Sequence, residues 1–420
     1  MDDKTLYTKI LGLQMPWFVD RVELSELKQR VDVYLKHEDN IRAQCPECKT
    51  FYSVYDHGPE RIYRHLNTCQ METYVHVRLP RVDCPKDGVR QIQSEFGENG
   101  SEMSYAMEKH LIRMLKECSI ESVRRLCDIG WHQGWGIVKR AVERGFERKT
   151  HRIPRKIGVD EKSFSKGHNY ETLVYDNEKG TVEYVCDNRE QASLEAYYKE
   201  FTCEELGQVE SVSMDMWDPY IAATKAFIPK AEEKIVFDRF HVIKQVTAGV
   251  DKVRRMEQRE LLEQEDRTLT GTKYLWLWNF ENIPSHRKIE FSELRRQDLK
   301  VGRAWALKEN IRHLWDLSSE GWMRRYFRKW YNWAIHSRLK PMQKAAKTLL
   351  THIDNIVTYA KHKITNAMGE SINSKIEKVK RLACGYRNRE HYKAVIYFHC
   401  GGLNMFPKAP EEPTICTKAT

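Results

Sequence analysis

Residues 156–176 read KIGVDEKSFSKGHNYETLVYD, and this stretch decides which fold the sequence predicts. Ile157 and Val159 favour an extended strand, and after a segment rich in turn formers residues 170–175 resume an extended pattern. The stretch therefore predicts a β-hairpin. Asp160 follows the first apolar run, where a carboxylate can simply end the strand or can hold a catalytic divalent metal. Carboxylates on other elements favour the metal.

The segments that follow predict a mixed sheet with helices on its faces. The pattern indicates strands at residues 181–186, 209–215 and 234–237 and helices at residues 193–201 and 218–227. An order of three strands, helix, strand, helix and strand packs naturally as an α/β sheet. Ligands of such sheets bind at the carboxyl ends of the strands, where Asp160, Asp215 and Asp238 all fall. Asp238 and the nearby His241 are candidates for an auxiliary role there.

The composition indicates a soluble protein of several domains. A chain of 420 residues is too long for one ordinary core, so we expect about two to four domains. The net charge of +10 fits either a polyanionic partner or a charged, solvated surface. No apolar run reaches the ~18 residues of a membrane helix and the first residues do not resemble a secretory signal, which predicts a cytoplasmic protein with no membrane partner. The odd number of cysteines, 11, fits reduced thiols plus one metal site.

The N-terminal segment carries no residues of recognisable chemistry. Leu24, Leu27, Val31 and Tyr34 lie at helical spacing. This spacing predicts a helical segment within residues 1–40.

A cysteine-bearing segment at residues 41–98 predicts a small zinc-finger-like domain. Cys45 and Cys48 form a CxxC knuckle that can bind Zn²⁺ from a tight turn, and Cys84 can add a third soft ligand. Asp87 stands at the spacing where a second Cys or His is expected, and Asp is a less usual zinc ligand. The other interpretation is a small β domain with free cysteines. The alternative fourth ligands are His65 and Cys69.

Residues 99–147 predict a helix-turn-helix. Apolar residues recur at helical spacing, and a break that contains Gly130 lets a second helix begin near Trp131. The second helix of such a pair can enter a groove of DNA, although ordinary helical hairpins share the pattern. The side chains that this helix would offer to a groove are His132, Gln133, Trp135 and Lys139.

The remaining connections fall into three segments. Residues 148–156 form a basic, proline-bearing linker in which Arg152 and Arg155 can follow phosphates. Residues 245–360 are charged and helical and hold seven of the eleven tryptophans. These rings can fill the core of a helical insertion, and one or two can stack on unpaired bases. Residues 401–420 predict a flexible tail.

Residues 363–388 predict a helix with an apolar and a polar face. Glu370 lies on the polar face with Asn373, Glu377 and Lys380, at helical spacing. Glu370 can therefore point at a site while the apolar face anchors the helix, or it can be a solvated carboxylate. The basic side chains of this helix that can bind phosphates are Lys375, Lys378, Lys380 and Arg381.

With these residues in view, the chain resembles the ISL3 family of bacterial insertion-sequence transposases, which have a DDE catalytic site. The segments that carry the resemblance are GVDEKSF around Asp160, SMDMWDPY around Asp215, FDRFHV around Asp238 and NAMGESINSKIEKVKRLACGYRN around Glu370. The resemblance spans nearly the whole chain. It implies an α/β RNase H-like catalytic domain over residues 157–400 with an all-helical insertion at about 245–360, preceded by zinc-binding-like and helix-turn-helix domains. Asp160, Asp215 and Glu370 match the catalytic triad.

The resemblance also implies the reaction and the partners. The three acids would hold two Mg²⁺ or Mn²⁺ ions about 4 Å apart. The enzyme would bind the terminal repeats of its element as double-stranded DNA, cleave there and join the freed 3′ ends to target DNA, as a homo-oligomer associated with the nucleoid. Asp87 departs from the family's usual Cys or His, which leaves the structural Zn²⁺ open. One alternative is an RNase H-like nuclease or resolvase without strand transfer. The other is a catalytically silent DNA-binding regulator, and the presence of all three acids disfavours only this second alternative.

Overall fold

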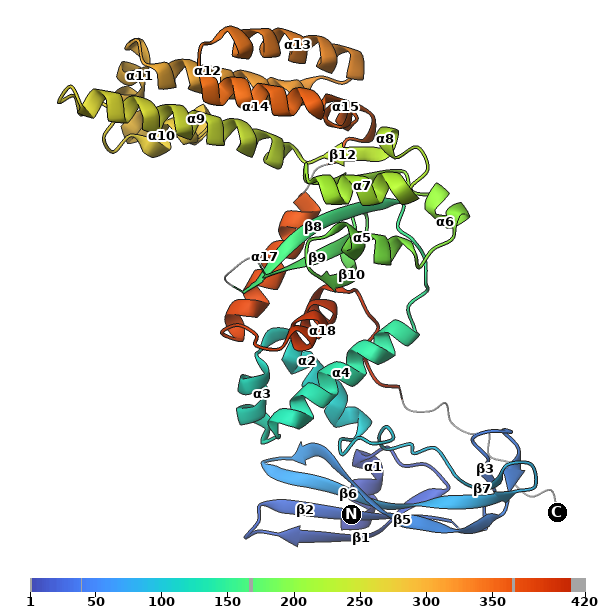
Figure 1. Cartoon of the computed structure of the whole chain (residues 1–420). Coiled ribbons are helices and arrows are strands. Elements are labelled where there is room, and N and C mark those ends of the chain that lie inside the picture. The colour runs from blue at the N-terminus through green and yellow to red at the C-terminus, as the bar shows by residue number, and fades with distance from the viewer. Residues whose placement is uncertain (1, 39, 166–168, 365–366, 409–420) are drawn as a thin grey trace. The chain divides into compact units, whose positions relative to one another are not determined.

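The computed structural model describes residues 2–38, 40–165, 169–364 and 367–408, and its elements are shown in Figure 1. The chain divides into two compact units. One comprises Met1–Lys149 and Leu403–Thr420, and the other comprises Thr150–Gly402. Within the described ranges, every helix is too short or too polar to span a lipid bilayer.

The first unit begins with strands where the sequence predicts a helical segment over residues 1–40. The elements are α1 (Asp3–Ile10), β1 (Trp17–Ser25) and β2 (Arg30–His37). In β2 the buried residues are Val31, Val33 and Leu35, so the apolar period is two and not the 3.6 of a helix. Leu27, which contributed to the helical spacing, lies in the turn between the strands and is 96% exposed. The predicted helical segment is therefore wrong beyond α1.

The main sheet of this unit has the order β1-β2-β6-β5, with β7 paired to β6. β2 and β6 run parallel, and the other pairs of this sheet run antiparallel. The remaining strands are β5 (Val54–Thr68), β6 (Met71–Cys84), β7 (Gly88–Gln91) and the separate pair β3 (Ala43–Gln44) and β4 (Phe51–Tyr52). The β3–β4 and β6–β7 hairpins each end in a tight turn, and these turns carry the cysteines of the CxxC segment and Cys84.

Three helices complete the first unit: α2 (Tyr105–Glu117), α3 (Ile120–Cys127) and α4 (Trp131–Glu147). α3 ends where Asp128 adopts a left-handed conformation with φ of 48°. The buried carboxylate of Glu108 on α2 accepts hydrogen bonds from Arg140 (2.9 Å) and Arg144 (2.6 Å) on α4. This buried charge network fixes α2 against α4, because a buried carboxylate needs such partners.

The chain returns to the first unit near its end. Leu403 and Met405 are buried. Arg144, itself buried, donates a hydrogen bond to the carbonyl oxygen of Met405, and Arg148 donates one to that of Phe406 (2.7 Å). The start of the tail that the sequence predicts to be flexible is thus packed against α4.

The second unit is built on a mixed five-stranded sheet of order β10-β9-β8-β11-β12. β10, β9 and β8 are antiparallel, and β8, β11 and β12 are parallel. The strands are β8 (Lys156–Ser165), β9 (Asn169–Asp176), β10 (Thr181–Asp187), β11 (Ser211–Met214) and β12 (Ile235–Phe237). The helices around it are α5 (Gln191–Tyr198), α6 (Cys203–Gly207), α7 (Asp218–Phe227), α8 (Ala231–Lys234), α17 (Ala367–Leu382) and α18 (Arg389–Cys400).

Strand β9 shows how both faces of this sheet are covered. Val174 packs into the core formed with α5 and α7, whereas its neighbours Leu173 and Tyr175 pack with α17 and α18. Successive side chains of a strand point to opposite faces, so all three are buried. The predicted mixed sheet with helices on its faces is confirmed.

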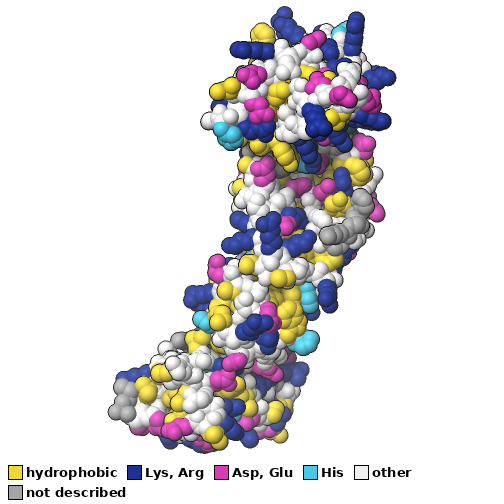
Figure 2. Space-filling view, turned by 90° about the vertical axis from the view of Figure 1, so that its left-hand side faces the viewer, with side chains coloured by type: hydrophobic (Ala, Val, Ile, Leu, Met, Phe, Trp, Pro, Cys, Tyr) yellow, Lys and Arg dark blue, Asp and Glu magenta, His cyan; other side chains and the backbone are white. Residues whose placement is uncertain are grey.

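Between β12 and α17 the chain is helical. The helices are α9 (Arg239–Leu262), α10 (Lys273–Leu277), α11 (Lys288–Arg296), α12 (Lys300–Ile311), α13 (Glu320–His336), α14 (Lys340–Thr351), α15 (Ile353–Val357) and α16 (Tyr359–His362). Trp276 and Trp330 are buried in a core that continues into that of the sheet, whereas Trp322 and Trp333 are exposed. Lys308 is also fully buried, and its Nζ donates to the carbonyl oxygen of Trp278 (2.5 Å). Figure 2 shows many Lys and Arg side chains spread over this helical region, at the top of the view.

Candidate functional site

The register of the parallel strands brings three carboxylates to one level. β11 pairs with β8 on one side and with β12 on the other. Extending this register past the last paired residues sets Asp215 level with Asp160 on β8 and with Asp238 after β12. Asp215 and Asp238 directly follow β11 and β12, at the carboxyl ends where ligands of α/β sheets bind. The expectation that Asp160 ends its strand is wrong, because β8 continues past it to Ser165, pairing with β9. Asp160 therefore lies inside β8, level with the other two acids.

His241 joins two of these acids. Asp238 is the N-cap of α9 and accepts a hydrogen bond from the Phe240 backbone N–H (3.2 Å), which places His241 in the first turn of the helix. The Nδ1 of His241 lies 2.7 Å from Asp215 Oδ1, and its Nε2 lies 3.7 Å from Asp238 Oδ2. Burial opposes protonation of His241, but the hydrogen bond to Asp215 and the charges of both acids outweigh it and raise its pKa. One ligand atom from each of Asp215, Asp238 and His241 lies within 4.8 Å of the other two, close enough to share a metal ion.

Asp160 is partly buried, and both of its carboxylate oxygens accept hydrogen bonds. Its Oδ1 accepts the backbone N–H of Glu161 (2.7 Å), and its Oδ2 accepts the side-chain amide of Asn373 on α17 (2.5 Å). Burial, with a contribution from the negative charge of Asp215, raises the pKa of Asp160. Negative charges crowded together in this way are stabilised by a cation, and carboxylate oxygens are the ligands that Mg²⁺ and Mn²⁺ prefer.

Glu370 lies in the first turn of α17 and is exposed. The residue of α17 that contacts the row of acids formed by Asp160, Asp215 and Asp238 (the acid row) is Asn373. It lies one helical turn after Glu370 on the same face and donates a hydrogen bond to Asp160. α17 runs beside β8, because Glu377 pairs with Lys162 (3.1 Å) and Lys380 donates to the carbonyl oxygen of Ser163 (2.9 Å). Glu370 is thus one helical turn from the contact with Asp160.

The structure adds residues that the sequence did not single out. Glu161 forms an ion pair with Arg189, and burial raises the pKa of Glu161. The Arg189 guanidinium lies 3.9 Å from the centre of the Trp217 ring, whose Nε1 donates back to the Arg189 carbonyl oxygen (3.2 Å). Glu161 directly follows Asp160 and could have been found from that position. Arg189 follows a different strand, and no local pattern indicates it.

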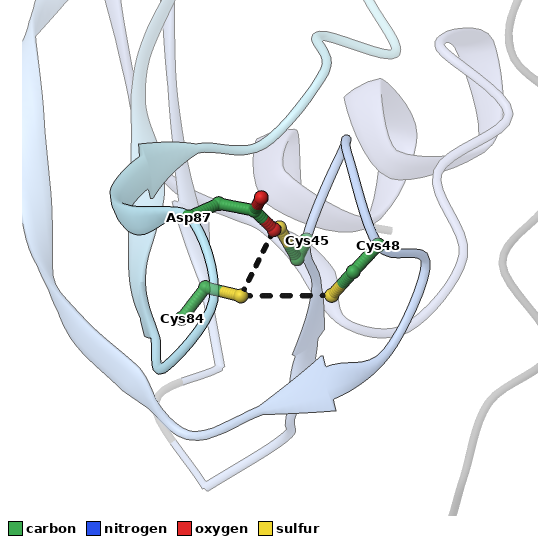
Figure 3. Close-up of side chains that lie close together, drawn as sticks. All are labelled: Cys45, Cys48, Cys84 and Asp87. Atoms are coloured by element: carbon green, nitrogen blue, oxygen red, sulfur yellow. Dashed lines mark hydrogen bonds between the residues drawn. The ribbon is translucent and has the colours of Figure 1, made fainter.

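A second cluster lies in the first unit, where the side chains of Cys45, Cys48, Cys84 and Asp87 converge from two turns (Figure 3). The Sγ atoms of Cys48 and Cys84 are 3.6 Å apart, and Oδ2 of Asp87 lies 3.1 Å from Cys84 Sγ and 3.7 Å from Cys45 Sγ. Zn–S bonds of about 2.3 Å in a tetrahedron separate two sulfurs by roughly 3.8 Å. The donor set and its spacing therefore fit one zinc ion.

The alternative fourth ligands lie elsewhere. His65 on β5 contacts the hydroxyl of Ser104 through Nδ1 (2.8 Å). Cys69 is exposed in the turn between β5 and β6, whereas Cys84 is at the far end of β6. Thirteen strand residues at about 3.3 Å each separate the two ends. Asp87 is the residue that completes the cluster.

The residues expected to contact DNA differ in how free they are. On α4, His132 and Lys139 are exposed, Trp135 is half-buried and packs edge-to-face with Trp131, and Gln133 is held by Glu102 (2.6 Å). In the linker, Arg152 pairs with Asp176 (3.0 Å) and Arg155 with Glu210. On α17, Lys375 and Lys378 are exposed, and Arg381 pairs with Glu377 (3.5 Å).

Comparison with known proteins finds relatives for both segments that carry these clusters. The family model for ISL3 transposases, described as "Transposase", matches residues 157–396, and the model described as "zinc-finger of transposase IS204/IS1001/IS1096/IS1165" matches residues 41–87. The transposase for insertion sequence element IS1557 of Mycobacterium tuberculosis is 24% identical over 445 residues, which cover 99% of this chain and 98% of the relative. The transposase for insertion sequence element IS1001 of Bordetella parapertussis is 24% identical over 398 residues, which cover 93% of this chain and 97% of the relative.

Proposed function

Because the chain belongs to the ISL3 family of insertion-sequence transposases, we propose that it cleaves double-stranded DNA at the ends of its element and joins the freed 3′ ends to target DNA. The observation that carries this proposal is the row of Asp160, Asp215 and Asp238, which lie at one level across three neighbouring strands, with α17 lying beside the row. Phosphoryl transfer requires little covalent chemistry from a protein, so a site that concentrates metal-binding oxygens is suited to it.

We assign the catalytic acids as Asp160, Asp215 and Glu370, with Asp238 and His241 in auxiliary positions. Divalent cations bound by these acids, Mg²⁺ or Mn²⁺, would polarise the phosphate and lower the pKa of the attacking hydroxyl. His241 orients Asp215 through the 2.7 Å contact. Asn373 orients Asp160. Glu370 lies on the same face of α17 as Asn373. We therefore assign α17 as the helix that contributes the third catalytic acid.

The same proposal extends to the architecture. Three antiparallel strands followed by two parallel ones, with helices between them, support an RNase H-like catalytic domain over residues 157–400. The helical region between β12 and α17 would be its insertion. We further propose that α3 and α4 form a DNA-binding helix-turn-helix within residues 99–147, that zinc stabilises the domain at residues 41–98, and that the protein acts as a homo-oligomer on paired element ends.

The test is cleavage of a labelled DNA that carries the element's own flanks, with Mg²⁺ or Mn²⁺. Asp160→Asn and Asp215→Asn should abolish cleavage and keep end binding, because each replaces a charged ligand by a neutral one of the same shape. Asp298→Asn, an exposed acid on a loop of the helical region, is the matched control and should cleave like the unaltered protein.

Three results would count against the proposal. Cleavage without any joined product would favour a nuclease. Specific binding without cleavage by any form would favour a regulator. Loss of binding together with cleavage in the Asn variants would indicate misfolding, which thermal melting would reveal.

A further inference from the structure

A surface pocket of about 640 Å³ runs along α17 beside the acid row. Its lining residues are Lys162, Asn373, Ser374, Glu377, Lys378, Arg381 and Leu382. Asn373 belongs both to this pocket and to the hydrogen bond with Asp160. The pocket therefore begins where the proposed catalytic site ends.

The carboxylate of Glu377 pairs with two of the cations of this pocket. Glu377 lies 3.1 Å from Lys162 Nζ and 3.5 Å from Arg381 Nε. Lys162 keeps the pKa of Glu377 below its ordinary value, so the carboxylate remains charged. Lys162 is largely buried, whereas the Glu377 side chain is 39% exposed. Among the residues that the structure describes, Lys378 forms no ion pair.

We propose that the pocket binds one phosphodiester group of the DNA strand next to the bond that is cleaved, and that Glu377 occupies this phosphate position when DNA is absent. The inference rests on the function proposed above and names how that site holds its substrate. A carboxylate between a lysine and an arginine uses the same charge-assisted hydrogen bonds that a phosphate would use.

The spacing of the pocket suits this role. Lys162 lies two residues beyond Asp160 on β8, which is about 6.6 Å along a strand, and this is close to the separation of successive phosphates along DNA. A phosphate next to the one at the acids would thus reach Lys162.

The exposure of the ion pair between Glu377 and Arg381 suits this role as well. Exposed ion pairs are weak and are screened by salt, so a phosphate that the rest of the protein holds in place can displace Glu377. Random DNA would have to compete with this carboxylate, and the site would select DNA that is anchored elsewhere on the protein.

The experiment measures how binding of a short fluorescein-labelled duplex of unrelated sequence depends on salt, without metal, for the full chain. Glu377→Gln should bind about three- to tenfold tighter at moderate salt, and the slope of log K against log salt should steepen by about 0.9, which corresponds to one more phosphate contact. The matched control is Glu263→Gln, at the residue that caps the C-terminal end of α9, because Glu263 pairs with Arg259 at the same 3.5 Å and the same four-residue spacing. The control should keep the slope of the unaltered protein.

Two further variants make the test decisive. Adding Lys162→Met to Glu377→Gln should remove the gain, and so should adding Arg381→Gln, at a side chain that is 79% exposed, because each removes a cation that would hold the phosphate. Equal effects of Glu377→Gln and Glu263→Gln would overturn the inference, as would a gain that survives Lys162→Met. If Glu377→Gln melts early, Glu377→Ala, which removes the same charge, takes its place in each comparison.

These assays involve no cleavage, so the two proposals can fail separately. A steeper slope with no cleavage by the unaltered protein would overturn the proposed function only. Metal-dependent cleavage with an unchanged slope would overturn only the phosphate position.

Discussion

Asn373 donates its side-chain amide to Oδ2 of Asp160 over 2.5 Å, although the two residues are 213 positions apart in the chain. The bond ties α17 to β8 at the acid row, and it stabilises the ionised form of Asp160 against the burial that disfavours it. Residues that orient a metal ligand in this way commonly affect metal affinity about 10- to 100-fold.

Asn373→Ala should therefore raise the Mn²⁺ concentration needed for half-maximal cleavage by about 10-fold or more, with much of the rate recovered at high Mn²⁺. The measurement is cleavage rate against metal concentration. Ser371→Ala, at an exposed position on the same helix, should leave the curve in place. A uniform loss of rate at every metal concentration would show that Asn373 does not act through the metal site.

The cluster of Cys45, Cys48, Cys84 and Asp87 predicts one zinc per chain. Asp87→Cys should keep that zinc and slow its release to a chelator by about 10-fold or more, because thiolates are softer ligands than carboxylates. Cys84→Ala should lose the zinc and lower the melting temperature, since zinc binding supplies folding free energy in small domains. Cys69→Ser is the control, and its zinc content, measured by metal analysis, should equal that of the unaltered protein.

Glu171 predicts how stability depends on pH. It is fully buried on β9, and burial, together with the charge of nearby Asp187, raises its pKa from 4.5 to about 7. Because the pKa in the folded state lies above that of the unfolded chain, the folded protein holds this proton more tightly. The contribution to stability is complete below about pH 4.5 and is lost as the pH rises through about 7.

Glu171→Gln keeps the shape of the side chain and removes the ionisation. The free energy of unfolding should therefore fall by about 1–2 kcal/mol less in this variant than in the unaltered protein when the pH is raised from 5.5 to 8. Full conversion of the shift would give about 3 kcal/mol, but part of this stabilisation is already lost between pH 4.5 and pH 5.5, below the window that is compared. Urea denaturation at both pH values is the measurement. Glu178→Gln, which alters a surface pair with Lys156, should show the pH dependence of the unaltered protein.

Lys308 predicts a stability loss in the helical region. Its fully buried ammonium donates to the carbonyl oxygens of Leu277 (3.3 Å) and Trp278 (2.5 Å), which close the end of α10. Lys308→Met should cost about 1–3 kcal/mol, because the Leu277 oxygen would lose the lysine donor and the Trp278 oxygen would keep only the longer hydrogen bond from Trp305 Nε1 (3.4 Å). Thermal or urea denaturation would measure the loss. Lys300→Met, which removes an exposed ion pair with Glu260, should change stability by less than about 1 kcal/mol.

The sequence indicated the sheet of the second unit because its signals are local. Short apolar runs that end in Asp215 and Asp238, each followed by a helix start, indicate buried strands and the acids at their ends. The start of the first unit gives a misleading signal, because it predicts a helix where the chain forms two strands. Leu24, Leu27 and Val31 lie at helical spacing only because a tight turn separates two strands, and spacing alone cannot distinguish a turn from a helical face.

The side-chain contacts within the candidate site could not be predicted from local sequence patterns. The bond between Asn373 and Asp160 and the stack of Arg189 on Trp217 join distant segments, so they depend on tertiary packing. The sequence placed Glu370 and Asn373 on one helical face, but it could not show which of the two would contact an acid.

The return of the chain to α4 has a consequence for the order of synthesis. Arg144 is buried and completes its hydrogen bonds with the carbonyl oxygen of Met405, a residue that the ribosome adds only after the whole sheet and helical region have been made. The N-terminal unit therefore acquires these packing residues only after the second unit has been translated. A chain that stops before Met405 would keep every residue proposed to recognise or cut DNA and still leave a buried arginine without one of its acceptors. The stability of the N-terminal unit therefore depends on translation through residue 405.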